Sequence, residues 1–230
     1  MTLEQLNLDK STWKKVKLRD IGQLVMGGTP SKKEPDYYGD DYVWITPSDI
    51  DRQRIYQDTS NTKLSTLGYS VARHIPANSL LITAIASIGK NCINTVDCSC
   101  NQQIIALVPK PEYDVIFLYY AISNIEEYLH SIAGKTSVEI VNKTQLSEVS
   151  IEVPDLETQK VIANLLESYD KLIESEQSKY NNLLKQKGEI SNDLFTRGVY
   201  EGTRVIYVDI LQIRRYLHNK DREVKCKRIC

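Results

Sequence analysis

Residues 154–198 read PDLETQKVIANLLESYDKLIESEQSKYNNLLKQKGEISNDLFTRG, and this stretch decides the architecture. Its apolar side chains recur in steps of four and three, and no proline follows Pro154, so the spacing predicts one long amphipathic helix. About forty helical residues span roughly 60 Å, which is longer than one compact domain of this size requires. The positions of this seam are Ile162, Leu166, Tyr169, Ile173, Glu176, Tyr180, Leu183, Lys187, Ile190 and Leu194.

The seam predicts a partner helix, because an isolated amphipathic helix is only marginally stable in water. We expect a coiled coil with a second copy of the chain; a helix lying across its own domain is the alternative. In an antiparallel pair with its twofold axis between Asn181 and Asn182, Glu176 would face Lys187 of the other copy. On this hypothesis the two charges fix the register and the orientation of the paired helices, at some cost in the stability of the pair.

The residues before the helix predict a mixed domain, so the fold class is α+β: an α/β domain followed by a long coiled-coil helix. A partly alternating pattern, and elsewhere short apolar stretches separated by glycine and polar segments, predict strands, and helical spacing predicts one helix over Asp114–Ile132. Gly134–Thr136 is expected to be a loop. The expected strands are Trp13–Met26 with a bend at Gly22, Tyr42–Thr46, Leu80–Ala84, Cys92–Val96, Ile104–Val108 and Val149–Val153.

Three segments therefore follow one another: a domain over residues 1–153, the helix over residues 154–198 and a tail over residues 199–230. The tail has apolar residues spaced for a short helix from Ile206 to Leu217, and its last ten residues are basic.

The composition is that of a globular protein: 41% of the 230 residues are hydrophobic and 26% are charged. The longest apolar runs are too short to cross a bilayer, and residues 1–10 lack the features of a signal peptide. We therefore expect a cytoplasmic protein, with no membrane partner, whose five cysteines are reduced thiols.

The charge is distributed unevenly along the chain. Residues 1–153 carry 15 basic and 18 acidic residues, a net of −3; residues 154–198 carry 6 and 8, a net of −2; the tail carries 8 and 4, a net of +4. The acidic body argues against an obviously basic nucleic-acid binder. DNA binding would therefore depend on a few placed cations, or on a partner that supplies phosphate contacts.

No motif of catalysis or of cofactor binding emerges from the chain. Around Gly89-Lys90, a phosphate-binding P-loop would need glycine where Ala84 stands and a hydroxyl where Asn91 stands. The Cys98-Ser99-Cys100 spacing is not that of a zinc site. We predict no catalytic residue, no metal site and no cofactor.

A series of short motifs follows in order along the chain, and together they resemble a known family. They are Gly27-Gly28-Thr29-Pro30-Ser31, Pro35-x-Tyr37-Tyr38-Gly39, Trp44-Ile45-Thr46-Pro47-x-Asp49, Leu81-Ile82-Thr83, Ser87-Ile88-Gly89-Lys90, Asn101-Gln102-Gln103, Phe117-Leu118-Tyr119-Tyr120, Gly134-Lys135-Thr136, Pro154-Asp155-Leu156-Glu157-x-x-Lys160-x-Ile162-Ala163 and Asp193-Leu194-Phe195-Thr196-Arg197-Gly198. In this order they resemble a target recognition domain and spacer helix of type I restriction–modification specificity subunits.

The resemblance implies a non-catalytic subunit that reads half of a split double-stranded DNA target. Methyltransferase (M) and restriction (R) subunits would dock on it and supply the chemistry. A full specificity subunit has two recognition domains and two helices, whereas this chain has one of each. Either two copies pair to rebuild the whole, or the chain is a truncated product. A coiled-coil module that binds protein and not DNA is the alternative function.

DNA contacts are expected from loops, where amide and guanidinium groups can reach base edges and lysines can reach phosphates. Alternatively, the glycine turn only reverses the chain, Gln102 and Gln103 satisfy backbone groups, and Trp44 belongs to the core. The candidate DNA-binding residues are Gly27, Gly28, Thr29, Ser31, Lys32, Lys33, Thr46, Ser48, Asp49, Arg52, Lys90, Asn101, Gln102, Gln103, Lys135, Thr136 and Ser137.

Overall fold

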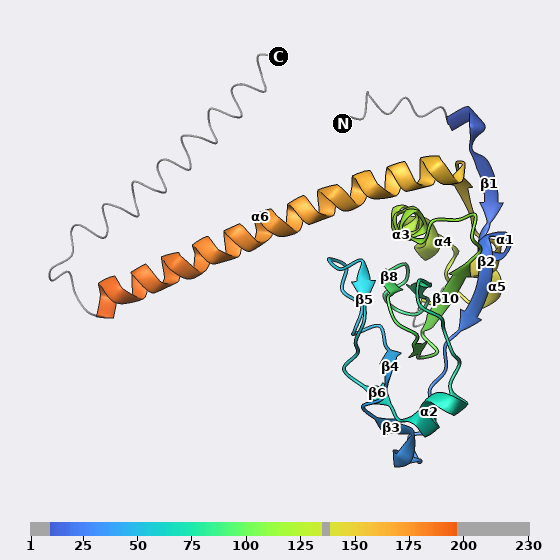
Figure 1. Ribbon diagram of the computed structural model, residues 1–230, viewed down its shortest axis with the longest axis horizontal. Coiled ribbons are helices and arrows are strands. Elements are labelled where there is room, and N and C mark those ends of the chain that lie inside the picture. The colour runs from blue at the N-terminus through green and yellow to red at the C-terminus, as the bar shows by residue number, and fades with distance from the viewer. Residues whose placement is uncertain (1–9, 135–138, 197–230) are drawn as a thin grey trace. The chain divides into compact units, whose positions relative to one another are not determined.

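The computed structural model describes residues 10–134 and 139–196 (Figure 1). The chain divides into two units, the first ending at Tyr169 and the second beginning at Asp170. The expected helix in the tail lies outside the described residues. Within the described ranges, no helix combines the length and the apolar character needed to cross a membrane.

A five-stranded mixed sheet forms the centre of the first unit. Neighbouring strands are antiparallel, except that β5 runs parallel to β8. In spatial order the strands are β2 (Gly22–Met26), β10 (Ile104–Pro109), β7 (Leu80–Thr83), β8 (Asn91–Asn94) and β5 (Tyr56–Gln57).

Both faces of this sheet are buried. Successive side chains of a strand point to opposite faces, and all four side chains of β7 are buried. In β7, Leu80 and Ile82 enter one hydrophobic cluster and Leu81 enters another. The second cluster also contains Ile45, Ile50, Ile75, Cys92, Cys98, Cys100, Ile104 and Ala106. The sequence of β7 is accordingly apolar at successive positions and does not alternate.

The first cluster is covered by helices, and α3 packs directly against β7 and β8. The α3 helix begins after Asp114, whose side chain accepts a hydrogen bond from the amide of Phe117 at 2.8 Å. An antiparallel ribbon of two strands joins the ends of this unit. The elements are α3 (Val115–Asn124), α4 (Glu126–Ile132), α5 (Lys143–Glu148), α1 (Leu18–Ile21), β1 (Lys14–Lys17) and β11 (Ser150–Val153), and a 3₁₀ turn, η2 (Lys10–Thr12), precedes them.

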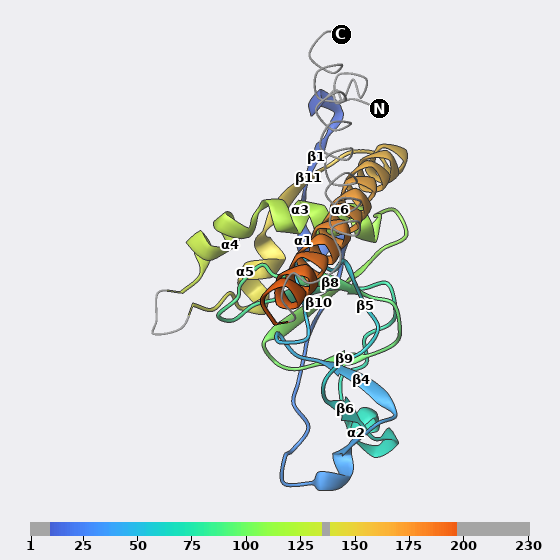
Figure 2. The same cartoon turned by 90° about the vertical axis from the view of Figure 1, so that its left-hand side faces the viewer.

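A second, four-stranded sheet with its own helix makes a small lobe, which Figures 1 and 2 show at the opposite end of the unit from α4 and α5. The helix of this lobe, α2, packs closely on the 3₁₀ turn η3: a Cβ at Gly68 would lie only 1.9 Å from the Tyr37 carbonyl oxygen. The small lobe consists of η3 (Pro35–Tyr37), β3 (Tyr38–Gly39), β6 (Lys63–Leu64), β4 (Tyr42–Ile45), β9 (Ser99–Cys100) and α2 (Thr66–Val71).

The predicted long helix is present as α6 (Leu156–Thr196), a single helix of 41 residues. Asp155 precedes it and accepts hydrogen bonds from the amide and hydroxyl of Thr158, and these bonds lower the pKa of the Asp155 carboxyl. Gln159 is buried, and its Oε1 accepts from the amide of Asp114 at 2.9 Å. Ala163 is buried in the first cluster. The first two turns of α6 therefore belong to the core of the first unit.

The structure confirms the α+β class and the expected strands near residues 42, 80, 92, 104 and 149, and corrects two elements. Trp13–Met26 is not one strand: a helical turn over Leu18–Ile21 interrupts it and buries both of its terminal side chains. The expected helix over Asp114–Ile132 is two helices, which meet at Ile125. Apolar spacing is helical on both sides of Ile125, so the pattern does not reveal this break.

Candidate nucleic-acid interface

The glycine turn, residues 27–31, packs against residues 100–104, which lead from β9 into β10. The amide of Gly27 donates to the carbonyl of Ile104 at 3.0 Å, and the amide of Gly28 donates to that of Cys100 at 2.8 Å. The hydroxyl of Thr29 donates to the side-chain oxygen of Gln102. A Cβ at position 27 would lie 2.0 Å from the Asn101 carbonyl oxygen, so this close approach requires glycine. Two of the predicted segments, residues 27–33 and 101–103, are therefore neighbours.

Residues 46–49, which follow β4, lie beside residues 100–104 as well, because the amide of Asn101 donates to the carbonyl of Ile45 at the end of β4 at 3.0 Å. Its conformation is fixed by Asp49, which accepts from the amide of Thr46 at 2.8 Å and from its hydroxyl at 2.6 Å. Lys90 reaches this turn and donates from Nζ to the carbonyl of Pro47 at 3.1 Å. The segments at 46–49 and at 90 are thus also joined.

Residues 84–90 form a turn that is bonded to residues 101–103. The amide of Ala84 donates to the carbonyl of Gln103 at 2.8 Å, and the amide of Ala86 donates to that of Glu139 at 3.2 Å. Ala86 and Gly89 both have positive φ, 64° and 84°, as a sharp turn requires. Lys135, Thr136 and Ser137 lie outside the described residues.

These contacts gather four sequence-distant segments into what we call the loop surface: residues 27–33, 46–52, 85–90 and 101–103. Within it, the predicted residues have different surroundings. Asp49 and Thr46 bond to each other, and Asn101 is buried and donates to the side-chain oxygen of Gln103 at 3.1 Å. Neither glutamine bonds to the backbone through its side chain in the described structure, unlike the alternative expectation. The exposed members are Thr29, Ser31, Lys32, Lys33, Ser48, Arg52 and Gln102.

Arg52, in the 46–52 segment of the loop surface, forms a salt bridge with Glu126 at the start of α4. Its Nη1 and Nη2 donate to the two carboxylate oxygens of Glu126, each at 2.6 Å. A Cβ at Gly89 would lie 2.8 Å from Cγ of Glu126, so the aliphatic part of this side chain packs against the 85–90 turn. The hydrogen bond from Arg52 lowers the pKa of Glu126 and raises that of Arg52. The pair therefore braces two segments of the loop surface.

This salt bridge predicts a pH-dependent contribution to stability. Because the pKa of Glu126 is held below its usual 4.5 in the folded chain, the contribution is present at neutral pH and is lost as the pH falls through the lowered value. Glu126→Gln is expected to lower the free energy of unfolding by about 1 kcal/mol at pH 7, since both groups are partly exposed. Urea denaturation at pH 7, 4.5 and 3.5 measures this difference, which should shrink with acidification. Glu127→Gln, at an exposed neighbour, is the control; an equal effect of both variants at every pH would contradict the prediction.

The cysteines within the described residues are structural. Cys92, Cys98 and Cys100 are buried in the second hydrophobic cluster. Burial raises the pKa of the Cys92 and Cys98 thiols to about 12 and that of Cys100 further in the same direction. Protonated, buried thiols are poor nucleophiles, so these three side chains serve the packing of the core.

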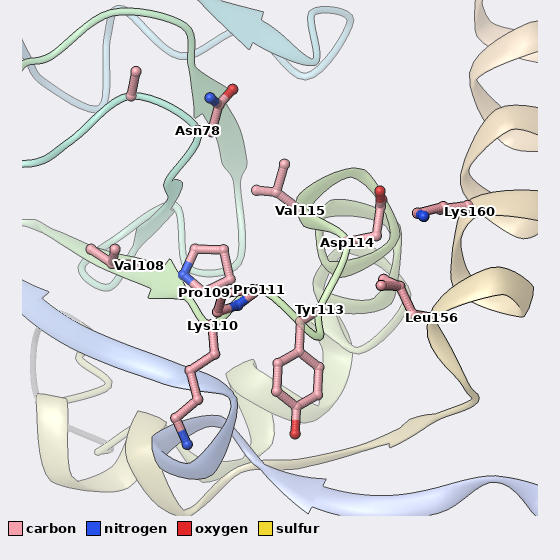
Figure 3. Close-up of a pocket in the computed structure, with 11 residues that line it drawn as sticks. Asn78, Val108, Pro109, Lys110, Pro111, Tyr113, Asp114, Val115, Leu156 and Lys160 are labelled. Atoms are coloured by element: carbon pink, nitrogen blue, oxygen red, sulfur yellow. The ribbon is translucent and has the colours of Figure 1, made fainter.

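A pocket of about 440 Å³ is lined by residues outside the loop surface (Figure 3). Its wall is formed by the end of β10, the start of α3 and the first turns of α6, and Figure 3 shows Asp114 and Lys160 on facing sides. Its lining residues do not include the predicted DNA-binding residues. The loops, and not this pocket, therefore form the candidate site.

Sequence reasoning missed the side chains that hold the glycine turn from the small lobe. Trp44 was expected in the core, and it is buried, but its indole N–H also donates to the carbonyl of Gly28 at 3.1 Å. Tyr38 and Arg73 also donate to carbonyls of this turn. A buried indole N–H requires an acceptor, which was the available signal for Trp44; the other two contacts are purely tertiary.

A specificity-subunit structure that has already been solved has this fold. The crystal structure of the HsdS subunit from Thermoanaerobacter tengcongensis superimposes with a TM-score of 0.59 at 17% identity, covering 84% of this chain and 47% of that chain. At this identity the likeness establishes the fold: a mixed α/β domain followed by a long helix.

The sequence identifies the family. Residues 10–186 match the family described as "Type I restriction modification DNA specificity domain", and the chain belongs to this family. The type I restriction enzyme MjaIX specificity subunit of Methanocaldococcus jannaschii is 32% identical over 179 residues, 76% of this chain and 41% of that protein. The HindI specificity subunit of Haemophilus influenzae is 31% identical over 163 residues, 67% and 36% respectively. The predicted family is confirmed, and the chain spans about two fifths of the length of these curated relatives.

Proposed function

We propose that the chain is a non-catalytic DNA-specificity component of a type I restriction–modification system, a half-length form that reads one half of a bipartite target. Residues 1–153 would form the recognition domain, residues 154–198 the spacer and pairing helix, and residues 199–230 a basic tail. The observation that carries the proposal is the convergence of the predicted DNA-contact segments into one loop surface.

The exposed members of the loop surface have the chemistry for two kinds of contact. Lys32 and Lys33 carry cations that can seat phosphates without reading sequence. Gln102 has an amide that can pair with a base edge, and Thr29 lies beside it. The lysines would set affinity and register, and the amide would contribute to sequence discrimination.

The helix supports pairing with a second copy. Beyond Asp170, the described apolar side chains of α6 remain uncovered: Ile173 is 63% exposed and Tyr180 is 56% exposed. An antiparallel pair with its axis between residues 181 and 182 matches Ile173 with Ile190, Tyr180 with Leu183, and Glu176 with Lys187. The side chain of Leu194, the last seam position, lies outside the described residues. This self-matching register favours a homodimeric coiled coil over a helix without a partner.

Three kinds of macromolecular partner follow from this function: double-stranded DNA, M and R subunits of the same system, and a second copy of the chain. All would meet in the cytoplasm. The net charge of the body is −3, so we expect the methyltransferase subunit to supply much of the phosphate contact. Co-purification from the native cell would reveal the partners and the stoichiometry.

The direct test is the binding of the full chain, with and without its methyltransferase partner, to duplexes selected from a randomised bipartite library. Wild-type protein is expected to select a split sequence and to bind it with an affinity that falls as salt rises. If no duplex is selected with the partner present, the proposed function is wrong, and a protein-interaction module becomes the explanation.

The salt dependence of that binding tests the two lysines. The double variant Lys32→Gln, Lys33→Gln should reduce the slope of log affinity against log salt concentration by about 2, about one for each lost phosphate contact. Target and non-target duplexes should lose affinity about equally. The matched control replaces Lys14 and Lys15, an adjacent pair on β1 that is paired to β11, with glutamine. An unchanged slope in the first variant, or an equal loss in the control, would contradict the assignment.

A further inference from the structure

We infer that Tyr38, Trp44 and Arg73 are positioning residues, which hold the glycine turn in the conformation that contacts DNA. The inference rests on the proposed function and deepens it. These residues belong to the small lobe, and we do not expect them to touch the DNA. Their effect would pass through residues 27–33.

The three side chains donate hydrogen bonds to carbonyls within one short segment, residues 26–30. Arg73 Nη1 donates to the carbonyl of Met26 at 2.5 Å and lies 3.4 Å from that of Gly27. The indole of Trp44 donates to Gly28 at 3.1 Å. The hydroxyl of Tyr38 donates to the carbonyl of Pro30 at 2.8 Å. The carbonyls of residues 26, 27, 28 and 30 are therefore directed to donors of the small lobe.

The donors are themselves fixed. Trp44 is only 6% exposed, and its backbone amide donates to the hydroxyl of Ser60 at 3.0 Å. The ring of Tyr38 packs edge-on against the indole, with ring centroids 6.2 Å apart and planes at 78°. Arg73 lies two residues after the end of α2, beyond the C-cap Ala72. The three donors thus come from β3, from β4 and from the segment after α2, and the rings of Tyr38 and Trp44 pack against each other.

The arrangement leaves the opposite edge of the turn with groups suited to an anion. In the described part of the chain, the amides of Ser31 and Lys32 meet no acceptor, and the side chains of both residues are exposed. Carbonyl oxygens repel phosphate, whereas amide protons and ammonium groups attract it. Across a trans peptide, the carbonyl of one residue and the amide of the next point in opposite directions, so the bond from Tyr38 to the Pro30 carbonyl directs the amide of Ser31 away from Tyr38.

The glycines explain why such a short segment is held by so many donors. Gly28 has open space around its α-carbon, so its backbone is not restrained by side-chain packing. Ordering a flexible loop on binding costs conformational entropy, and a loop that is ordered beforehand avoids that cost. Thr29 of this turn also bonds to Gln102, the amide proposed to read a base edge. Loss of one donor should therefore weaken the specific complex more than it weakens non-specific binding.

The test uses Tyr38→Phe, which removes the hydroxyl and keeps the ring against Trp44. The full chain with its methyltransferase partner is measured on the duplex selected by the wild type and on a scrambled duplex. Loss of one hydrogen bond should weaken target binding about fivefold, with less than a twofold change on the scrambled duplex. Tyr42→Phe, a change in the same lobe at a tyrosine that stacks on Tyr69, is the control and should leave both affinities unchanged.

A purely structural role would lower the melting temperature and change both affinities alike, and that result would overturn the inference. Equal target affinity of Tyr38→Phe and wild type would overturn it as well. Arg73→Gln provides a second variant, with the same expected loss of discrimination. Failure of the wild type to select any duplex would instead reject the proposed function, so the two failures are distinguishable.

Discussion

Replacing Gly27 with alanine is expected to abolish binding of the target duplex and to lower the free energy of unfolding by about 2–3 kcal/mol. The added methyl group would lie 2.0 Å from the carbonyl oxygen of Asn101 and 2.6 Å from that of Cys100. Both obstacles are backbone atoms, so neither can rotate away. The turn must then separate from residues 100–103, and the loop surface loses its continuity.

Gly28→Ala is the matched control for stability, because no atom lies within 4 Å of a Cβ at that position. It should retain the free energy of unfolding to within about 0.5 kcal/mol. Urea denaturation measures the stability of both variants, and duplex binding measures the loss of the target by Gly27→Ala. If Gly27→Ala bound the selected duplex as well as the wild type does, the packed glycine turn would not be part of the DNA interface.

Reversing one charge of the helix seam is expected to dissociate the pair of chains. In the antiparallel register, Glu176→Lys places two lysines against each other at two symmetric sites. Interfacial charge pairs carry large coupling energies, and we expect the dimer to weaken about a hundredfold, or about 3 kcal/mol. The second change, Lys187→Glu in the same chain, should restore dimerisation. Concentration-dependent sedimentation measures both.

Lys185→Glu serves as the control, because Lys185 lies outside the seam and its amine is paired at 3.9 Å with Glu189 of the same helix. Loss of dimer in this variant as well would indicate a general charge effect. Replacing both Glu176 and Lys187 with leucine tests their role in orientation: if the pair remains strictly antiparallel, the two charges do not determine its direction.

The elements that the sequence predicts well are those whose periodicity is long enough to detect. Heptad spacing over ten seam positions predicts α6, and continuous apolar runs predict β7 and β10. The two-residue strands β3, β5, β6 and β9 have no detectable period and were missed. The turn of helix at Leu18–Ile21 was missed because four residues are too few to display a helical period.

The candidate site was predictable as a set of segments, because side chains suited to DNA contact occur in the expected loops at 27–33, 46–54 and 101–103 and at Lys90. The sequence alone could not predict how each side chain is used. Asp49 and Asn101 were candidates for DNA contact, yet Asp49 fixes its own turn and Asn101 is buried. The contact of Arg73 with Met26 spans 46 intervening residues, which no local pattern can reveal.

The central claim is that two copies, paired through α6, present two DNA-reading domains to one split target. Sedimentation equilibrium of the full chain, over concentrations from nanomolar to micromolar, tests this claim most directly. A species of twice the mass of one chain that dissociates on dilution is expected, and Glu176→Lys is expected to sediment as one chain. A wild-type protein with the mass of a single chain at every concentration would contradict it.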